Sequence, residues 1–194
     1  NLLIIGYENG LIEIVKDEED DILAVVDILE KQTIPPNKKR INHFHEYNGE
    51  VFISTQYGIS VYDLGALEFG DTYFIGDLGA QIEITQTTVF ENLIYASSSN
   101  NGIRSAFVEN DNLIDYQQWT TITDGGYNGI QSLNTELYTV RNNNVIYRYS
   151  PGNGFVEVGN FNTSIVDFNV TSDVLTITTS NSIHAYSEGF VLES

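Results

Sequence analysis

The chain has 194 residues, of which 27 are acidic and 8 are basic, and its net charge is −19. This balance argues against nucleic acid and anionic membrane surfaces as partners, because proteins approach both through Lys and Arg. The absence of cysteine excludes disulfides and thiolate chemistry. No apolar stretch approaches the ~18 residues that a membrane-spanning helix needs, so we expect no membrane insertion.

A short hairpin recurs five times: an apolar run, a tight turn, and a second apolar run that is often rich in tyrosine. The hairpins lie at 2–15, 51–63, 93–107, 137–149 and 174–186. Their turn residues are Gly10, Gly58, Gly102, Asn144 and Ser182. Hairpins repeated at about 40–50 residues are typical of β-propeller blades, so the repeat predicts an all-β propeller.

From the second hairpin onward, a strand-like run precedes each hairpin and another follows it. Four strands per repeat is the composition of a propeller blade. The first repeat lacks the preceding run, because residue 1 already lies in its second strand. We therefore expect residues 1–194 to form one partial propeller of about four to five four-stranded antiparallel blades. The expected blades cover approximately 1–34, 38–78, 80–124, 128–161 and 163–194.

The acidic run at 17–21 follows the first hairpin. Carboxylates supply the oxygen ligands that calcium prefers, so Asp17, Glu18, Asp20 and Asp21 are candidates for a structural calcium site. The run lacks the alternating D-x-D-x-D-G pattern of a preformed calcium loop, and we favour a solvated turn. We expect no other cofactor.

The segment 21–32, DILAVVDILEKQ, permits two interpretations. Ile22, Val25, Val26 and Leu29 follow helical spacing and favour an amphipathic helix. The repeat, however, requires the outer strand of the first blade at this place, and β-branched residues suit a strand. We predict a strand.

The next segment carries Lys38, Lys39 and Arg40, three of the eight bases. They follow Pro35 and Pro36 and precede an inner strand, which places them on a loop at one rim of the propeller. An anionic glycan or the acidic face of a partner can dock on such a cluster. An ordinary surface loop is the alternative, and it is the one we favour for a cluster of three.

His43 and His45 lie two residues apart and therefore share one face of the strand that follows. Two imidazoles in this arrangement can bind zinc, but a third ligand is needed and His184 is three blades away. We favour structural histidines. Trp119, the only tryptophan, is a candidate for stacking on a sugar or anchoring a partner.

Several sequence pieces occur in an order that resembles the N-terminal propeller of PorZ-type proteins. The pieces are YENGLIEIV at 7–15, KKRINHFHEYNGEVFIST at 38–55, YGISVYDLGALEFGDTYFIG at 57–76 and IYASSSNNGIRSA at 94–106, followed by Trp119. The resemblance covers residues 2–120, whereas the last two repeats fit only as generic blades.

This resemblance implies a cell-surface component of the type IX secretion system, within the machinery that joins secreted cargo to an anionic lipopolysaccharide. It also implies an extracytoplasmic location and a longer protein with further domains. It supplies no catalytic residues, and the sequence contains no G-x-S-x-G or phosphate-binding glycine loop.

We therefore expect a non-enzymatic scaffold that binds partner proteins or anionic lipopolysaccharide. Lys38, Lys39, Arg40 and Trp119 are the candidate contacts, and open propeller edges are candidates for self-association. A ligand-sensing propeller of a hybrid two-component regulator is the alternative. A propeller lyase or glycosidase is a third, but the chain has only 3 histidines to supply such a site.

Overall fold

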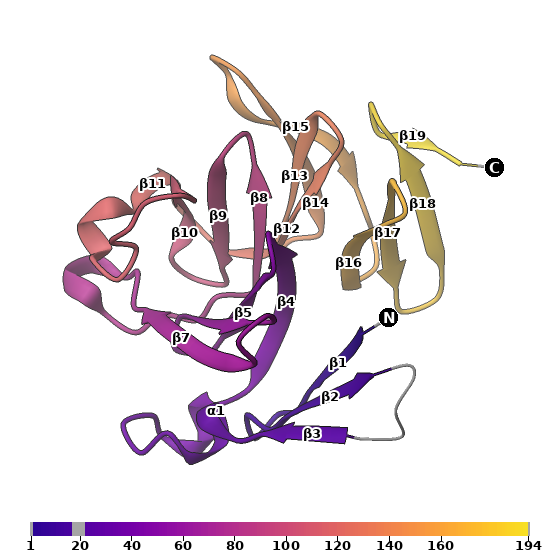
Figure 1. The fold of residues 1–194 in the computed structure, drawn as a ribbon. Coiled ribbons are helices and arrows are strands. Elements are labelled where there is room, and N and C mark those ends of the chain that lie inside the picture. The colour runs from indigo at the N-terminus through magenta and orange to yellow at the C-terminus, as the bar shows by residue number, and fades with distance from the viewer. Residues whose placement is uncertain (1, 17–21, 194) are drawn as a thin grey trace. The chain divides into compact units, whose positions relative to one another are not determined.

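The structure, a computed structural model, describes residues 2–16 and 22–193, which contain five antiparallel sheets (Figure 1). Four of the sheets have four strands and the first has three, and within each sheet the strands pair in sequence order. The predicted all-β propeller architecture is confirmed. By its contacts the chain divides into two compact units, residues 1–84 with 114–116 and residues 85–113 with 117–194.

The first unit contains two sheets. The three-stranded sheet consists of β1 (Leu2–Gly6), β2 (Ile12–Lys16) and β3 (Ile22–Val25). The four-stranded sheet consists of β4 (Ile41–Tyr47), β5 (Glu50–Thr55), β6 (Ile59–Asp63) and β7 (Glu68–Tyr73). The connections carry α1 (Asp27–Glu30), η1 (Pro36–Lys38) and η2 (Asp77–Gly79). Within the described ranges, no helix is long and apolar enough to span a membrane.

The segment after the acidic run is part strand and part helix. β3 pairs with β2 from Ile22 to Val25, as predicted, but Asp27–Glu30 form a single helical turn. The strand prediction was therefore wrong for 27–30. The turn directs Ile28 inward, where only 2% of its surface is exposed, while Asp27 and Glu30 remain at the surface. Burial of this apolar side chain stabilises the turn in spite of its short length.

One apolar core joins the two sheets of the first unit. Ile12, Ile14 and Val25 contribute from the first sheet, and Val51 and Ile53 from the second. Further members of the core are Ile28, Ile34, Tyr57 and Tyr62, with Phe44 and Phe69 packed against them. Alternate residues of β2 point into this core, which is the period expected of a strand with one buried face.

The second unit contains three four-stranded sheets. The first is β8 (Gln86–Phe90), β9 (Leu93–Ser98), β10 (Gly102–Phe107) and β11 (Thr120–Thr123), with η3 (Tyr116–Gln118) before its last strand. The second is β12 (Tyr127–Leu133), β13 (Glu136–Arg141), β14 (Val145–Ser150) and β15 (Gly154–Asn160). The third is β16 (Ile165–Thr171), β17 (Val174–Thr179), β18 (Ile183–Ser187) and β19 (Val191–Leu192).

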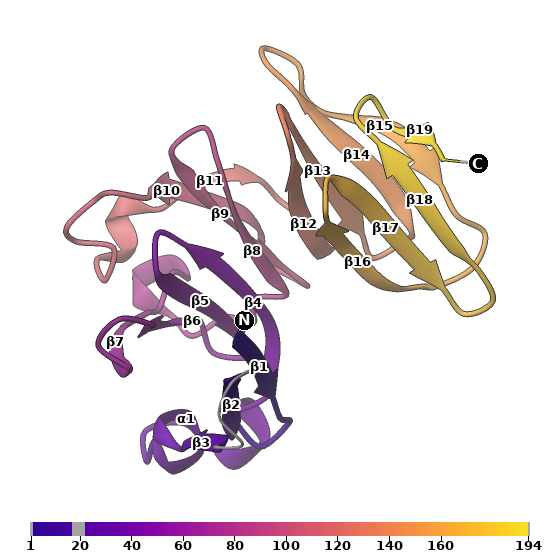
Figure 2. The ribbon, with the colours of Figure 1, turned by 45° about the vertical axis from the view of Figure 1, so that its right-hand side comes forward.

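Two apolar clusters hold these three sheets together. One cluster joins the first sheet to the second through residues such as Ile103 and Leu137. The other joins the second sheet to the third through Tyr138, Phe168 and Leu175. Figure 2 shows the sheets β12–β15 and β16–β19 stacked face to face. Face-to-face packing of consecutive sheets is the arrangement that a propeller requires.

The turn glycines are explained by a close approach of the backbone. A Cβ atom at Gly58 would lie 2.3 Å from the carbonyl oxygen of Tyr73, and one at Gly102 would lie 2.0 Å from that of Thr123. In both sheets the outer strand therefore passes directly over the central hairpin turn, which only glycine permits. At the equivalent turn of the next sheet, Asn144 adopts φ 63°, a conformation that asparagine tolerates.

Candidate functional site

The basic cluster predicted from the sequence lies on the connection between α1 and β4. Pro35 precedes the 3-10 turn, and the amide of Lys38 donates a 2.9 Å hydrogen bond to the Pro35 carbonyl. Ile34 is 2% exposed and fixes the start of the loop in the core. The loop therefore has a defined conformation before any ligand binds.

Lys39 is turned inward, unlike its two neighbours. Only 7% of its surface is exposed, and its Nζ donates a 2.6 Å hydrogen bond to the carbonyl oxygen of Leu29 in α1. Carbonyl oxygens in the last turn of a helix lack partners within the helix, and a lysine can supply one. Lys39 thus ties the loop to α1, which is a structural role.

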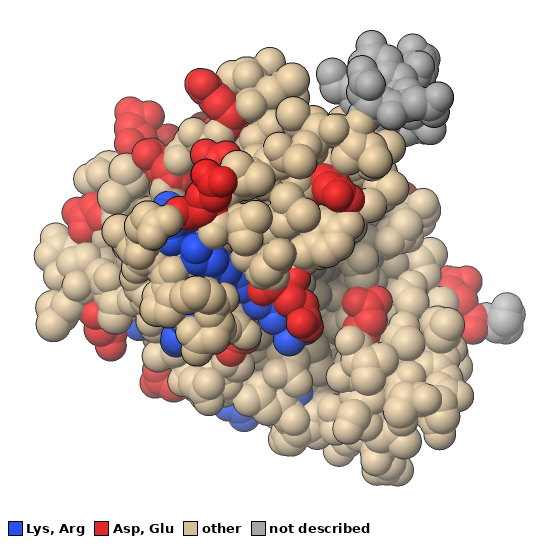
Figure 3. All heavy atoms as spheres, turned by 90° about the horizontal axis from the view of Figure 1, so that it is seen from below, with Lys and Arg blue, Asp and Glu red and all other residues tan. Residues whose placement is uncertain are grey.

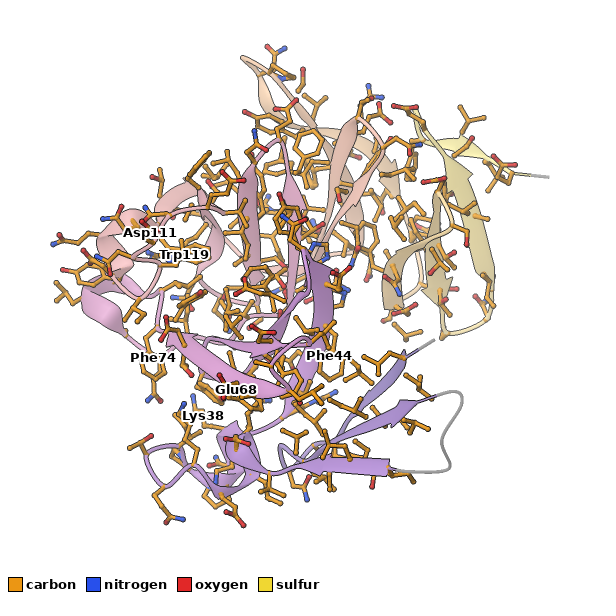
Figure 4. The ribbon with its side chains drawn as sticks, in the orientation of Figure 1. Lys38, Phe44, Glu68, Phe74, Asp111 and Trp119 are labelled. Atoms are coloured by element: carbon orange, nitrogen blue, oxygen red, sulfur yellow. The ribbon has the colours of Figure 1, made fainter. Side chains whose placement is uncertain are left out.

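Lys38 and Arg40, on either side of Lys39, are exposed, and Figure 4 labels Lys38 on this connection. Within the described part of the chain, neither side chain is held by an ion pair. On the face drawn in Figure 3, many of the visible Lys and Arg atoms lie in one band with Asp and Glu atoms beside it, and others lie apart from the band. The loop can therefore present two positive charges to a partner.

Trp119 does not lie on the surface. It sits between η3 and β11 with 5% of its surface exposed, and its Nε1 donates a 3.0 Å hydrogen bond to the carbonyl oxygen of Leu113. Leu113 is itself 5% exposed. The indole therefore anchors the long connection between β10 and β11, and its burial argues against contact with a ligand in this conformation.

His43 and His45 lie on the same side of β4, opposite Ser54 and Phe52 of β5. Burial, and secondarily the neighbouring His45, lowers the pKa of His43 to about 4. Burial also lowers the pKa of His45, against the opposing effect of Glu46. Both imidazoles are therefore neutral near pH 7. The third histidine, His184, is engaged by the Ser182 hydroxyl at 2.8 Å and by the ring of Phe161.

A metal site is not found among the residues that the structure describes, because no three His, Asp or Glu side chains converge there. The candidate calcium ligands Asp17, Glu18, Asp20 and Asp21 lie outside the described residues. The structural calcium site therefore stays a prediction.

The sequence did not predict a cavity on the second unit that contains an arginine. Arg141 ends β13 and lines a surface cavity of about 300 Å³ together with Tyr127 and Tyr147. These residues come from three strands of one sheet, so their spacing in the sequence gives no signal of the cluster. Tyr127 pairs with Arg141 because the register between β12 and β13 shifts between Tyr127 and Gly129, and the sequence alone does not predict where such a shift lies.

A family model described as the N-terminal β-propeller domain of PorZ, from the type IX secretion system, matches residues 1–120. No curated protein matches the sequence. The matched range contains all the pieces on which the sequence resemblance was based.

Solved structures also resemble the chain. PorZ of Porphyromonas gingivalis, described as an essential bacterial surface component of the type-IX secretion system, superposes with a TM-score of 0.79 at 16% identity. The similarity covers 98% of this chain and 25% of that one, so the chain spans about a quarter of that PorZ.

Two further structures show how widely the fold occurs. The extracellular domain of a candidate one component system from B. thetaiotaomicron gives a TM-score of 0.68 at 15% identity, covering 100% of this chain and 27% of that one. A chain of the Mitotic Checkpoint Complex gives a TM-score of 0.71 at 12% identity, and the similarity covers 99% of this chain and 59% of that one. At such identities the likeness establishes the fold alone, because unrelated functions share it.

Proposed function

The chain belongs to the family of PorZ N-terminal β-propeller domains, and we propose that it is a non-catalytic binding scaffold of a type IX secretion component at the cell surface. In this proposal the exposed rim loop with Lys38 and Arg40 receives an acidic partner, either a protein face or anionic lipopolysaccharide. An extracytoplasmic location is part of the same proposal. Family membership supports the scaffold role, and the loop supports the choice of partner.

The observation that carries the choice of partner is the contrast between Lys39 and its neighbours. The buried Lys39 anchors the loop to the Leu29 carbonyl, which holds Lys38 and Arg40 outward. Preorganised charges lose less conformational entropy on binding than flexible ones. On a chain of net charge −19, neighbouring positive charges attract an anionic ligand against the general repulsion.

The experiment replaces Lys38 and Arg40 with Gln and measures binding of the purified protein to anionic lipopolysaccharide at increasing salt. We expect the double variant to bind more weakly and with a smaller salt dependence, because two screened attractions are removed. Lys39 is left unchanged, since its replacement would disturb the loop itself.

The matched control replaces Asn112 and Asn162, both exposed, with Asp. It changes the net charge of the protein by the same amount as the double Gln variant but leaves the loop intact. If both double variants bind equally weakly, general repulsion explains the loss and the loop is not the site. Unchanged binding in Lys38→Gln/Arg40→Gln would also reject it.

The sensing propeller is a second candidate, supported by the likeness to the extracellular domain from B. thetaiotaomicron. The two proposals differ in what the rest of the protein contains. A membrane-spanning helix followed by a kinase indicates a sensor, whereas a further propeller and a β-domain indicate the surface scaffold. The complete gene sequence distinguishes them.

A further inference from the structure

The cavity on the second unit combines one cation with aromatic rings and small polar groups. It is lined by the end of β11, by strands of the sheet β12–β15 and by the turn between β14 and β15. Its volume is about 300 Å³. The residues that give it its chemistry are Thr123, Tyr127, Arg141, Tyr147, Asn153 and Phe155. All belong to one compact unit.

Two tyrosine rings hold the guanidinium of Arg141. Its Cζ lies 5.2 Å from the ring centroid of Tyr127 and 5.7 Å from that of Tyr147. Tyr127 is the cross-strand partner of Arg141 and is 3% exposed, so one side of this clamp belongs to the core. Contacts of a guanidinium with aromatic faces are attractive and fix its plane.

Arg141 has no carboxylate within ion-pair distance in the described part of the chain, although the protein is strongly acidic. Its only hydrogen bond there is a long one, 3.4 Å, from Nη2 to the carbonyl oxygen of Asp124. Arg148, on the next strand, forms an ion pair with Glu136 at 2.7 Å. Arg141 therefore keeps most of its five N–H donors for another acceptor.

We propose that this cavity binds a sugar carboxylate of the hexuronate class, with the carboxylate on Arg141 and the sugar ring against the aromatic lining. The cavity does not include Lys38 or Arg40, so this proposal and the function proposed above can be tested independently of each other.

The charge of the site selects the carboxylate. The lining contains one cation and the whole chain is strongly acidic, so a monoanion is matched and a phosphate dianion is not. The planar guanidinium fork fits a carboxylate through two parallel hydrogen bonds.

The remainder of the lining selects a sugar ring. Tyr147 and Phe155 offer apolar ring surface of the kind on which sugar C–H groups pack. The amide nitrogen of Asn153 donates to the Ser150 hydroxyl at 3.3 Å, which leaves its carbonyl oxygen to accept from a sugar hydroxyl. A volume of about 300 Å³ is at the lower end for small-molecule sites, which suits one sugar unit.

The test titrates the purified protein with glucuronate, its uncharged methyl ester and glucose, and follows the amide resonances of Asn153 and Gly154. We expect saturable shifts with glucuronate. The affinity for both uncharged sugars should be weaker than that for glucuronate by roughly tenfold or more, because the charge-assisted hydrogen bonds are lost. Equal affinity for glucuronate and glucose overturns the proposal. Because this comparison changes the ligand, it holds even where a variant misfolds.

Variants then locate the site. Arg141→Gln is expected to reduce glucuronate affinity roughly tenfold, and Arg141→Lys to recover little of it, because lysine lacks the planar fork. Asn112→Asp, at an exposed position outside the cavity, lowers the net charge by the same one unit and serves as the control. Full affinity in Arg141→Gln, or an equal loss in Asn112→Asp, overturns the assignment.

Two further ligands complete the test. Glucose 6-phosphate is expected to bind more weakly than glucuronate, and tighter binding would overturn the choice of a carboxylate. An oligosaccharide with terminal glucuronate distinguishes the sources of the ligand: tighter binding than the free sugar indicates a glycan end, and equal or weaker binding indicates the free sugar acid. Either result supports the shared carboxylate chemistry.

Discussion

The ammonium group of Lys39 lies 2.6 Å from the carbonyl oxygen of Leu29 and donates a hydrogen bond to it. Lys39→Met would keep the side-chain volume but leave this partly buried carbonyl without its partner. We expect a loss of about 1–3 kcal/mol in the free energy of unfolding, measured by chemical denaturation. Lys38→Met, at an exposed position, is expected to change stability by less than about 0.5 kcal/mol. Equal effects of both substitutions would contradict a structural role for Lys39.

Gln86 connects all three sheets of the second unit. Its Nε2 donates to the Phe168 carbonyl at 2.8 Å, and its Oε1 accepts from the Ile130 amide at 2.9 Å. A Cβ atom at Gly129 would lie 2.7 Å from that Oε1 and 3.0 Å from the ring of Phe168. Gly129→Ala therefore displaces Gln86, and we expect a loss of about 1–3 kcal/mol in unfolding free energy.

The control for Gly129→Ala is Gly70→Ala in β7, where the nearest atoms lie 3.9 Å from the added Cβ. We expect this variant to be nearly neutral or slightly stabilising, because alanine restricts the unfolded chain. The paired variant Gly129→Ala/Gln86→Ala is expected to lose less stability than the sum of its parts. Additive losses would show that the two residues do not interact.

His43 is expected to make stability depend on pH. Burial lowers the pKa of its imidazole to about 4 in the folded protein, below the ordinary value of 6.5. As pH falls below 6.5, the unfolded chain takes up a proton that folded His43 does not. The stabilisation is therefore complete above that pH and is lost as pH falls toward about 4.

The measurement for His43 compares unfolding free energies at pH 7 and pH 5. The unmodified protein should lose about 2 kcal/mol more over this interval than the His43→Gln variant, which has no imidazole to titrate. Titration of the imidazole followed by NMR gives the folded pKa directly. A midpoint near 6.5 would be incompatible with this account.

The sequence predicted the architecture because each hairpin repeats the same apolar pattern and turn chemistry. It also placed Lys38 and Arg40 on an exposed loop. It did not predict the burial of Lys39 and Trp119, because their partners are the backbone carbonyls of Leu29 and Leu113, and a carbonyl has no sequence signature. The helical turn at 27–30 agrees with the local helical spacing and not with the strand that the repeat predicted, and packing of Ile28 into the core stabilises it.

Glu136 joins β13 to the turn between β18 and β19. Its carboxylate accepts hydrogen bonds from Arg148 at 2.7 Å and from the Gly189 amide at 2.6 Å, and a third from the Tyr138 hydroxyl. Desolvation raises the pKa of this carboxyl, but the hydrogen bonds and the Arg148 charge outweigh it and hold the pKa below the ordinary value of 4.5. The charged form therefore stabilises the folded state above that pH, and the stabilisation is lost as pH falls through the folded pKa.

Glu136→Gln keeps the shape of the side chain and removes its charge. At pH 7 we expect a loss of about 1–3 kcal/mol in unfolding free energy, because charge-assisted hydrogen bonds become neutral ones. The difference from the unmodified protein should shrink as pH falls below 4.5, where the unmodified side chain also becomes neutral. Glu157→Gln, on the exposed face of β15, is the matched control and should have little effect at either pH. If the difference in unfolding free energy between Glu136→Gln and the unmodified protein stays constant with pH, the charge of Glu136 does not join the two sheets. Packing of Tyr138 against Phe190, whose ring centroids lie 5.9 Å apart, is then the better explanation.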